Sequence, residues 1–411
     1  MNDSAGMAEA RADLTSWLFN LALPFWSTRG IDGAAGGFIE RFTPQGAPLD
    51  DPRRARVVGR HIFSFAVAER LGWDGPARAV VRHGLDALER QHLQADGVLI
   101  PLVAAGGVPL STAFDLYDHA FVLFGLAAAH RLGERSRALE ARAEALLTRM
   151  CGWRHPVAGF EEAMPRTLPL KANPHMHLFE AGLAWSESIQ GGRWDGLADG
   201  VANLCLARFL DPRTGALQEF FDGDWRALTD EAGSVVEPGH QFEWAWLLIR
   251  WGVLRDRPDA IAAARRLVEI AEIHGVDGHR DLAVNELNRD LSVRDDRARL
   301  WPQTERIKAH VALAAIARSQ DERMLALDRA VRAVRGLMTF FDHPVPGAWW
   351  EHLDREGRPM VEPSRASSLY HIMCAMDVLR TPLDPGGFGG ERVSCQPGRR
   401  VSDDVKSVIA T

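Results

Sequence analysis

The run HAFVLFGLAAAHRLG, at residues 119–133, is apolar on nearly every side when it is wound as a helix. The stretch RHIFSFAVAERLG, at residues 60–72, has the same character and the same ending, RLG, with glycine at a position where helices commonly stop. A helix that is apolar all round is buried among other elements rather than laid on a surface. These two stretches therefore predict core helices in a mostly helical fold.

Similar apolar helices recur along the chain, and amphipathic segments separate them. The further apolar segments cover residues 177–189, 240–254, 306–318 and 369–380. The amphipathic segments, in which charged residues alternate with apolar ones at helical spacing, cover residues 76–93, 134–150, 195–210, 258–274 and 321–341. Buried and covering helices thus alternate about six times.

A polar residue stands near the start of each apolar helix, and these residues recur at intervals of 58 to 70: Arg60, His119, His177, His240, His310 and His371. Such a period over the whole chain indicates a repeat architecture. Six helical hairpins closed into a ring form an all-α (α/α)6 barrel, and an open solenoid is the competing arrangement. We predict the closed barrel, because the histidines and the arginine make better sense converging at one mouth than strung along a surface.

Short segments with alternating polarity around a polar turn precede four of the apolar helices, which predicts short β-hairpins or loops at the mouth of the barrel. These segments are GGFIERFTPQGAP (36–48), GFEEAMPRTLP (159–169), GALQEFFDGDWRAL (215–228) and GAWWEHLDREGRPM (347–360). We expect one barrel domain over residues 1–381. The remainder, 382–411, is rich in Gly, Pro and charge and is expected to be a loose tail.

The composition argues against several classes of protein. The 411 residues carry a net charge of -7, and no run of Lys or Arg suggests a polyanionic partner. No apolar stretch is long enough to span a membrane, no secretion signal is evident, and the four cysteines lack metal-binding spacing. We therefore expect a cytoplasmic protein, monomeric or homodimeric, with no nucleic-acid or membrane partner.

The stretch EPGHQFEWAW, at residues 237–246, places His240 and Glu243 three residues apart among large apolar side chains. Burying two ionisable groups there is costly unless they are paired or functional. A histidine suits proton transfer near neutral pH, and a carboxylate on the same helical face could hold its tautomer. The alternative is a histidine satisfied within the core, with Glu243 at the start of the helix.

The same spacing recurs in His177 and Glu180, and other polar residues lie at the starts of the apolar helices. They are Arg60, Tyr117, Asn173, Trp301, Glu305 and His371. For each of these residues singly, a helix cap or a core hydrogen bond is an equally good explanation. Together they predict a pocket whose aromatic faces and polar groups suit the C–H surfaces and hydroxyls of a sugar.

A metal ion is the rival explanation for this group, because His175, His177 and the two HxxE pairs could ligate one. The sequence has no HExxH motif, and His175 and His177 point to different sides of a helix. It also has no GxxxxGK[ST] loop, no GxGxxG after a strand and no GxSxG. We therefore expect neither a metal nor a cofactor.

In the order and spacing of the motifs GRHIFSF, DLYDHAF, NPHMHLFEA, EPGHQFEWAW, LWPQTE and SSLYHI, the chain resembles the N-acylglucosamine 2-epimerase superfamily. That superfamily includes cellobiose 2-epimerases, mannose isomerases and sulfoquinovose isomerases, and the resemblance spans about residues 35–380. It implies the (α/α)6 barrel, in agreement with the repeats, and a metal-independent proton transfer beside the carbonyl of a sugar.

The resemblance also implies a role for each motif residue. His240 and His371 match the two general acid/base histidines, Arg60 matches the arginine that stabilises the enediolate oxygen, and Glu243 would orient His240. The positions that line the sugar are matched by Tyr117, Asn173, His177, Trp301 and Glu305.

The resemblance is nearest to mannose isomerase-like members, so we expect an aldose–ketose isomerase of the mannose/fructose type that acts through a cis-enediol(ate). A 2-epimerase, on N-acylglucosamine or another sugar, stays open because two opposed histidines serve either outcome. A glycoside hydrolase on the same barrel is the alternative from another class. It needs two carboxylates flanking a glycosidic bond, and the excess of histidines argues against it.

Two charged segments complete the interpretation. Residues 277–299 form a long charged stretch before Trp301, which we expect to be a functional loop acting as a lid. Arg53, Arg54 and Arg56 could reach a phosphate on the substrate, but we interpret them as a solvated basic turn.

Overall fold

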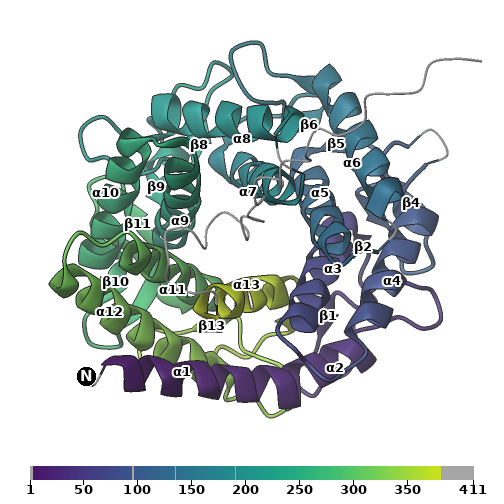
Figure 1. Ribbon diagram of the computed structural model, residues 1–411, viewed down its shortest axis with the longest axis horizontal. Coiled ribbons are helices and arrows are strands. Elements are labelled where there is room, and N and C mark those ends of the chain that lie inside the picture. The colour runs from purple at the N-terminus through teal and green to yellow at the C-terminus, as the bar shows by residue number, and fades with distance from the viewer. Residues whose placement is uncertain (1–2, 95–96, 135, 190, 381–411) are drawn as a thin grey trace, which may run out of the picture.

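Six helices form an inner ring in the computed structural model, which describes residues 3–94, 97–134, 136–189 and 191–380 (Figure 1). Each of them is buried along most of its length, as the apolar sequences predict. The inner helices are α3 (Ala55–Arg70), α5 (Leu116–Arg131), α7 (Ala172–Ser188), α9 (Pro238–Arg255), α11 (Leu300–Ala315) and α13 (Leu369–Arg380).

An outer ring of amphipathic helices surrounds the inner one (Figure 1). It consists of α4 (Ala77–Ala87), α6 (Ser136–Met150), α8 (Arg193–Leu204), α10 (Pro258–Gly275) and α12 (Gln320–Met338). Single π- or 3-10-helical turns extend four of these helices, η2 (Leu88–His92), η3 (Cys151–Trp153), η4 (Cys205–Phe209) and η6 (Thr339–Phe341).

The ring is closed by the start of the chain. The segment formed by α1 (Asp3–Trp17), η1 (Leu18–Ala22) and α2 (Leu23–Thr28) takes the place of the sixth outer helix, and α1 packs against α12 and α13. Helix α13 also packs against α3, so the first and last inner helices are neighbours. The predicted (α/α)6 barrel is confirmed, although the sequence analysis did not identify α1 as its sixth outer helix.

Short strands mark one end of the barrel, because each inner helix is preceded by a strand that pairs with a strand following the outer helix of the same hairpin. The pairs are β2 (Arg53–Arg54) with β3 (Leu102–Val103), β5 (Phe114–Asp115) with β6 (Ala163–Met164), β7 (Leu170–Lys171) with β8 (Phe220–Phe221), β9 (Val235–Val236) with β11 (Leu282–Asn288), β12 (Val293–Arg299) with β13 (His352–Leu353), and β14 (Ser364–Arg365) with β1 (Arg41–Phe42). The last pair joins the two ends of the ring. The strands adjoin the N-termini of the inner helices, where the sequence predicted hairpins and loops.

A recurring glutamate links neighbouring hairpins at this end. The side chain of Glu40 accepts the backbone N–H of Arg54 at 2.7 Å, and that of Glu351 accepts the N–H of Arg365 at 2.9 Å. Glu162 accepts the N–H of Lys171 in the same way. In each case the donor lies just before the next inner helix, so the carboxylate fixes where that helix begins.

Residues 277–299 differ from the predicted loop. They contain a complete β-hairpin, β11 and β12, which lies in a sheet with β9, β13 and the short strand β10 (Val276–Asp277). The apolar face of β11 packs in a small core of its own, through Val284 and Leu287. The long charged segment is therefore a paired β-hairpin, with Arg299 on the pocket wall, and its action as a lid stays a prediction. The expected tail, 382–411, lies outside the described residues.

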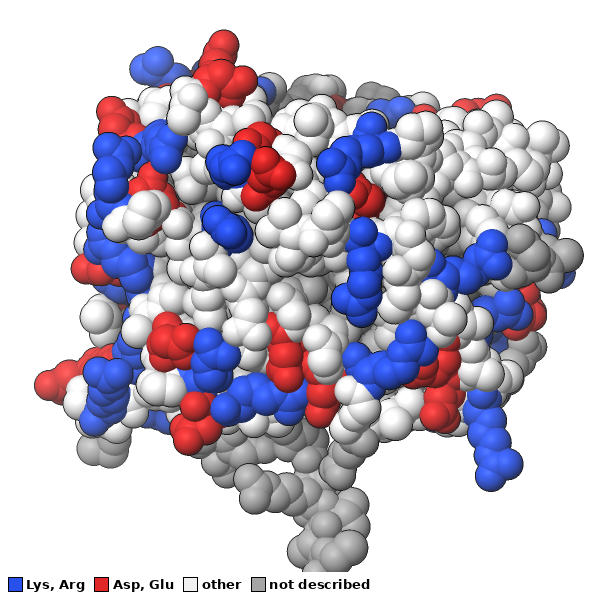
Figure 2. Space-filling view, turned by 90° about the horizontal axis from the view of Figure 1, so that it is seen from above, with Lys and Arg blue, Asp and Glu red and all other residues white. Residues whose placement is uncertain are grey.

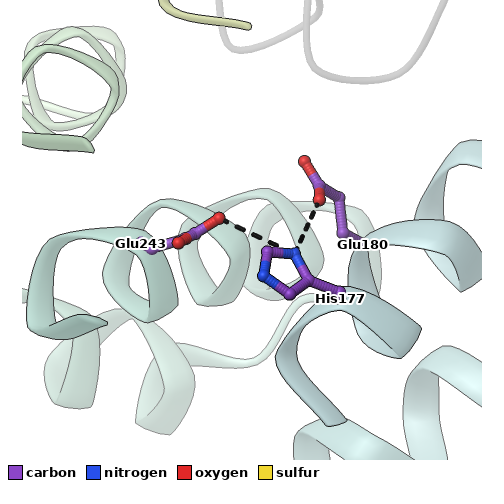
Figure 3. A group of neighbouring side chains, drawn as sticks. All are labelled: His177, Glu180 and Glu243. Carbon is purple, nitrogen blue, oxygen red and sulfur yellow. Dashed lines mark hydrogen bonds and ion pairs between the residues drawn. The ribbon is translucent and has the colours of Figure 1, made fainter. Parts of the chain in front are cut away.

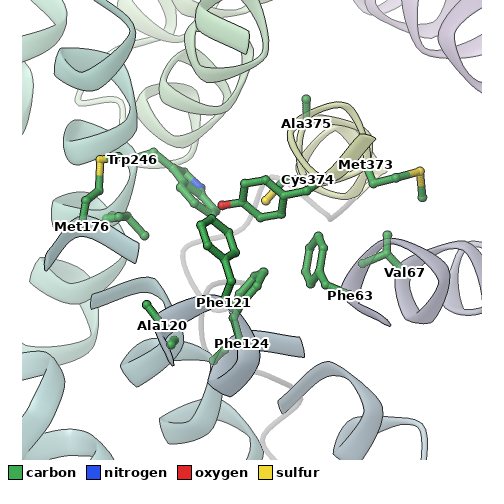
Figure 4. Packing of buried hydrophobic residues seen from close by; sticks show 14 of the residues in the cluster. Phe63, Val67, Ala120, Phe121, Phe124, Met176, Trp246, Met373, Cys374 and Ala375 are labelled. Atoms are coloured by element: carbon green, nitrogen blue, oxygen red, sulfur yellow. The ribbon is translucent and has the colours of Figure 1, made fainter. Parts of the chain in front are cut away.

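Neighbouring inner helices approach closely where glycine permits it. A Cβ atom added to Gly59 of α3 would lie 2.2 Å from the carbonyl oxygen of Phe121, and one added to Gly125 of α5 would lie 2.5 Å from that of Gly59. Aromatic side chains fill the adjacent core: Phe63 and Phe124 stack with centroids 4.4 Å apart, close to Cys374 of α13 (Figure 4). The centre of the barrel below the mouth is thus solidly packed.

The surface shows no large field of one sign on the side seen in Figure 2, where basic and acidic side chains are interspersed. Within the described part of the chain, no helix is long and apolar enough to cross a membrane.

Candidate active site

A pocket of about 480 Å³ opens between the strand pairs and the N-terminal turns of the inner helices. Eight of the nine residues predicted for the site line it: Arg60, Tyr117, Asn173, His177, His240, Glu243, Trp301 and His371. The ninth, Glu305, is fully buried behind the wall. Two of the repeating polar positions also lie elsewhere, since His119 contacts the carbonyl oxygen of Asp115 and His310 contacts Glu272.

His240 lies between two carboxylates. Its Nδ1 is 2.9 Å from Oε2 of Glu219 and 3.8 Å from Oε1 of Glu237. Burial alone would lower the pKa of His240, but these carboxylates outweigh it and raise the pKa to about 10. His240 therefore carries a proton at neutral pH and can act as an acid. Glu243 was predicted to orient this histidine but makes no hydrogen bond to it. The hydrogen bond is made with Glu219 instead.

His371 has the opposite environment. Its Nδ1 lies 2.8 Å from Oε1 of Glu305; in the tautomer in which Nδ1–H donates to this oxygen, Nε2 keeps its lone pair. Burial, followed by the positive charges of Arg60 and Lys308, holds the pKa of His371 well below its usual value. His371 is therefore an uncharged base at neutral pH. Glu305 contacts its Nδ1 and does not line the pocket.

The two histidines share one aromatic neighbour. The ring of Trp301 lies 5.0 Å from His240 and 5.7 Å from His371 between centroids. An indole face in that position offers an apolar platform for the C–H groups of a sugar. An acid and a base thus reach a ligand from two helices, α9 and α13, above a shared surface.

Arg60 provides the positive charge that faces the same space. It donates to the hydroxyl of Tyr117 at 2.8 Å and to the carbonyl oxygen of Ser367 at 3.2 Å, and its guanidinium lies 4.0 Å from the ring of Phe121. Its Nε has no hydrogen-bond partner among the described residues. The side chain is fixed by its neighbours and retains a donor, as stabilisation of a developing oxyanion requires.

His177 lies between two buried carboxylates on the other wall (Figure 3). Its Nδ1 is 3.4 Å from Oε2 of Glu180 and 3.9 Å from Oε1 of Glu243. Burial lowers the pKa of His177 despite these carboxylates. Nearby, Oδ1 of Asn173 is buried without a partner among the described residues, so it can accept a hydrogen bond from a hydroxyl of a ligand.

Three groups of His and Glu are close enough to hold a cation. They are His177, Glu180 and Glu243; Glu219, Glu237 and His240; and Glu243, Glu305 and His371. When His240 is protonated, both of its ring nitrogens carry hydrogen, so neither has a lone pair for a metal. The Lys308 ammonium already lies 2.5 Å from Glu305 and 3.8 Å from Glu243, so the protein supplies a positive charge there itself. The donor chemistry fits an internal cation better than a metal.

The basic stretch after residue 52 is ion-paired instead of solvated. Arg53 is buried and pairs with Asp32 at 2.9 Å, and Arg56 pairs with Asp118 at 2.8 Å. Arg54 donates to Glu40. Two other cations on the pocket wall, Lys171 and Arg299, have no ion-pair partner among the described residues.

The sequence analysis missed Glu219 and Lys308. The signal for Glu219 was present: it ends the third of the segments GGFIE, GFEE, GALQE and GAWWE, in which Glu40, Glu162 and Glu351 hold backbone amides. In this hairpin the recurring glutamate holds a histidine instead. Lys308 offered no comparable signal, because one lysine in an apolar helix does not reveal its partners on other helices.

Comparisons with known proteins indicate one family and the same fold. The family model described as N-acylglucosamine 2-epimerase (GlcNAc 2-epimerase) matches residues 37–375. The chain is 45% identical to a mannose-6-phosphate isomerase of Rhizobium meliloti (strain 1021) over 370 residues, which are 89% of this chain and 95% of the relative. It is 28% identical to a D-mannose isomerase of Thermobifida fusca over 370 residues, 84% of this chain and 88% of that protein. A crystal structure of a D-mannose isomerase superposes with a TM-score of 0.80 at 21% identity, over 90% of this chain and 98% of that one.

Proposed function

The chain belongs to the N-acylglucosamine 2-epimerase family of sugar isomerases and epimerases, and we propose that within it the chain is an aldose–ketose isomerase for a mannose-type hexose. The observation that carries the proposal is the contrasting surroundings of two histidines that share the indole of Trp301, with carboxylates beside His240 and the cations Arg60 and Lys308 acting on His371. Glu219 and Glu237 keep His240 protonated, whereas burial and nearby cations keep His371 neutral. Two groups whose environments drive their pKa values apart supply both an acid and a base at neutral pH.

The proposed reaction uses each histidine twice. Nε2 of His371 removes the proton from C2 of the open-chain aldose while the C1 carbonyl oxygen gains negative charge. Arg60 stabilises that charge, and His240 donates a proton to the oxygen, which gives a cis-enediol. His240 then takes the proton of the C2 hydroxyl as His371 returns its proton to C1. The product is the 2-ketose, and both histidines regain their starting states.

We further propose that the hexose carries a 6-phosphate. The relative at 45% identity is named for mannose 6-phosphate, and basic side chains on the pocket wall suit an anion. Lys171 and Arg299, which lack ion-pair partners among the described residues, are the cations available to a phosphate. Arg53, Arg54 and Arg56, by contrast, are occupied by carboxylates.

The reaction is also proposed to need no metal. The buried carboxylates nearest His371 are balanced by Lys308, and His240 is already protonated, so proton transfer and charge stabilisation both have groups in the protein.

The test is NMR of the purified protein in D2O with EDTA, with mannose 6-phosphate and D-mannose in separate samples. Signals of the matching ketose with deuterium at C1, and of recovered aldose with deuterium at C2, are expected, and faster conversion of the phosphorylated sugar would support the 6-phosphate. The His371→Gln variant is the matched control. A product that is only the C2 epimer would replace the isomerase by a 2-epimerase, and N-acetylmannosamine is the next substrate to test in that case.

A further inference from the structure

Lys308 is a fully buried cation near the axis of the barrel, below the pocket. It comes from α11 and faces three buried carboxylates, Glu180 of α7, Glu243 of α9 and Glu305 of its own helix. Its Nζ lies 2.5 Å from Oε2 of Glu305 and 3.8 Å from Oε1 of Glu243. A lysine is almost never fully buried unless it is paired, so this position has a physical reason.

The surroundings of this cluster are apolar and aromatic. Nζ of Lys308 lies 4.0 Å from the ring centroid of Trp246, which lies with Cys374 and Phe121 in the packed centre of the barrel (Figure 4). The hydroxyl of Tyr370 donates to Glu180 from the opposite side. In such a medium charges interact strongly, so moving or removing one of them changes the others.

Two chains of side-chain contacts connect Lys308 with residues of the pocket. One runs through Glu305, whose other oxygen lies 2.8 Å from Nδ1 of His371. The second runs through Glu243, which lies 3.9 Å from Nδ1 of His177 (Figure 3). Lys308 therefore lies where both carboxyl–histidine contacts meet.

We propose that Lys308 is a positioning residue that anchors Glu305 and, through it, holds the imidazole of His371 as an uncharged base with Nε2 facing the substrate. The role in catalysis rests on the proposed function. Lys308 touches no substrate, and it acts through charge and through the orientation of Glu305.

The groups that face His371 fix the sign of the expected effect. The groups are Arg60 of α3, His177 of α7, Lys308 of α11 and Arg299 of β12, whose positive charges lower the pKa of His371, and the carboxyl groups of Glu243 of α9 and Glu305 of α11. Burial lowers the pKa of His177, and burial together with the charge of Glu243 raises the pKa of Glu305 well above its usual value. Removing Lys308 takes away one cation and leaves both carboxyl groups in place. Protonation of His371 then becomes easier, so its pKa rises.

The variant Lys308→Met tests this, with Arg306→Met as the control. Arg306 is also a fully buried cation of α11, but it pairs with Glu272 and Asp281 and does not line the pocket. The Cε1–H signals of labelled histidines are followed against pH, and His371 is assigned by its loss in His371→Gln. We expect the pKa of His371 to rise by about one pH unit or more in Lys308→Met and to stay unchanged in Arg306→Met.

Kinetics give the second readout. The acidic limb of kcat/KM should move to higher pH in Lys308→Met, and activity should recover at alkaline pH, whereas a purely structural loss lowers the rate at every pH. If Lys308→Met does not fold, Lys308→Gln removes the charge but keeps a donor to Glu305 and carries the same expectation. Lys308→Arg, which keeps the charge, should leave the limb in place.

A titration of His371 that coincides with the parent in both neutral variants, or that shifts equally in Arg306→Met, would overturn the proposal. The titration needs no substrate. A parent protein that converts none of the sugars would therefore count against the proposed function, and the position of the His371 titration would still decide the role of Lys308.

Discussion

Glu219→Gln is the substitution that best tests the division of labour between the two histidines. It removes the negative charge next to Nδ1 of His240 but keeps an oxygen that can accept the hydrogen bond. Glu237 stays 3.8 Å from the ring and continues to favour protonation. The variant should therefore lower the pKa of His240 while the hydrogen bond at its Nδ1 is kept.

The size of the effect follows from that contact. A hydrogen bond to a charged group contributes about 1.5–3 kcal/mol, and one pKa unit corresponds to about 1.4 kcal/mol, so the loss amounts to about one to two units. The pKa of His240, about 10 in the parent, should fall to about 8–9. Because His240 must carry its proton, activity is kept at low pH and lost as the pH rises through this value. A fall to about 8.5 would cost about fourfold in rate at pH 9 and little at pH 7.

The assay is kcat/KM against pH for parent, Glu219→Gln and the control Glu40→Gln, each corrected for the uncatalysed reaction of the sugar in alkali. Glu40 occupies the equivalent place in another hairpin, where it accepts the N–H of Arg54 and makes no contact with His240. Its variant should keep the parental alkaline limb. An alkaline limb of Glu219→Gln that superimposes on the parent would refute the assignment of His240 as an acid held by Glu219.

Three other predictions concern the base, the metal and the packing. His371→Gln should lower kcat by about 10²–10⁴-fold, as loss of a general base does, while far-UV circular dichroism stays parental; a loss below tenfold would remove His371 as the base. Dialysis against EDTA should leave kcat unchanged, and a loss restored by a divalent cation would contradict the internal role of Lys308. Gly59→Ala should lower the free energy of unfolding in urea by about 1–3 kcal/mol, because the added methyl meets the backbone of α5. Gly33→Ala, where a Cβ meets nothing within 4 Å, should show no such loss.

Much of the fold could be predicted from residues 60–380, because its signal is local and repeated. An apolar run such as 119–133 can only be a buried helix, and its alternation with amphipathic segments gives the hairpin count. The pocket could be predicted for the same reason, because the repeated helix starts bring Arg60, His177, His240 and His371 to one end of the barrel. The N-terminal helix was missed because it repeats no motif and finds its place only by packing on α12 and α13.

Sequence by itself determined which residue types reach the pocket, whereas the tertiary structure decided what each one can do. Helical spacing suggested Glu243 as the partner of His240, but the contact belongs to Glu219, which is 21 residues away along the chain. Glu305 was expected beside the sugar and instead holds His371 from a neighbouring helix, with Lys308 behind it. The charge state of a buried group depends on desolvation and on charges within a few ångströms. Those distances are set by how separate helices pack, so the acid and the base can be distinguished only in the closed barrel.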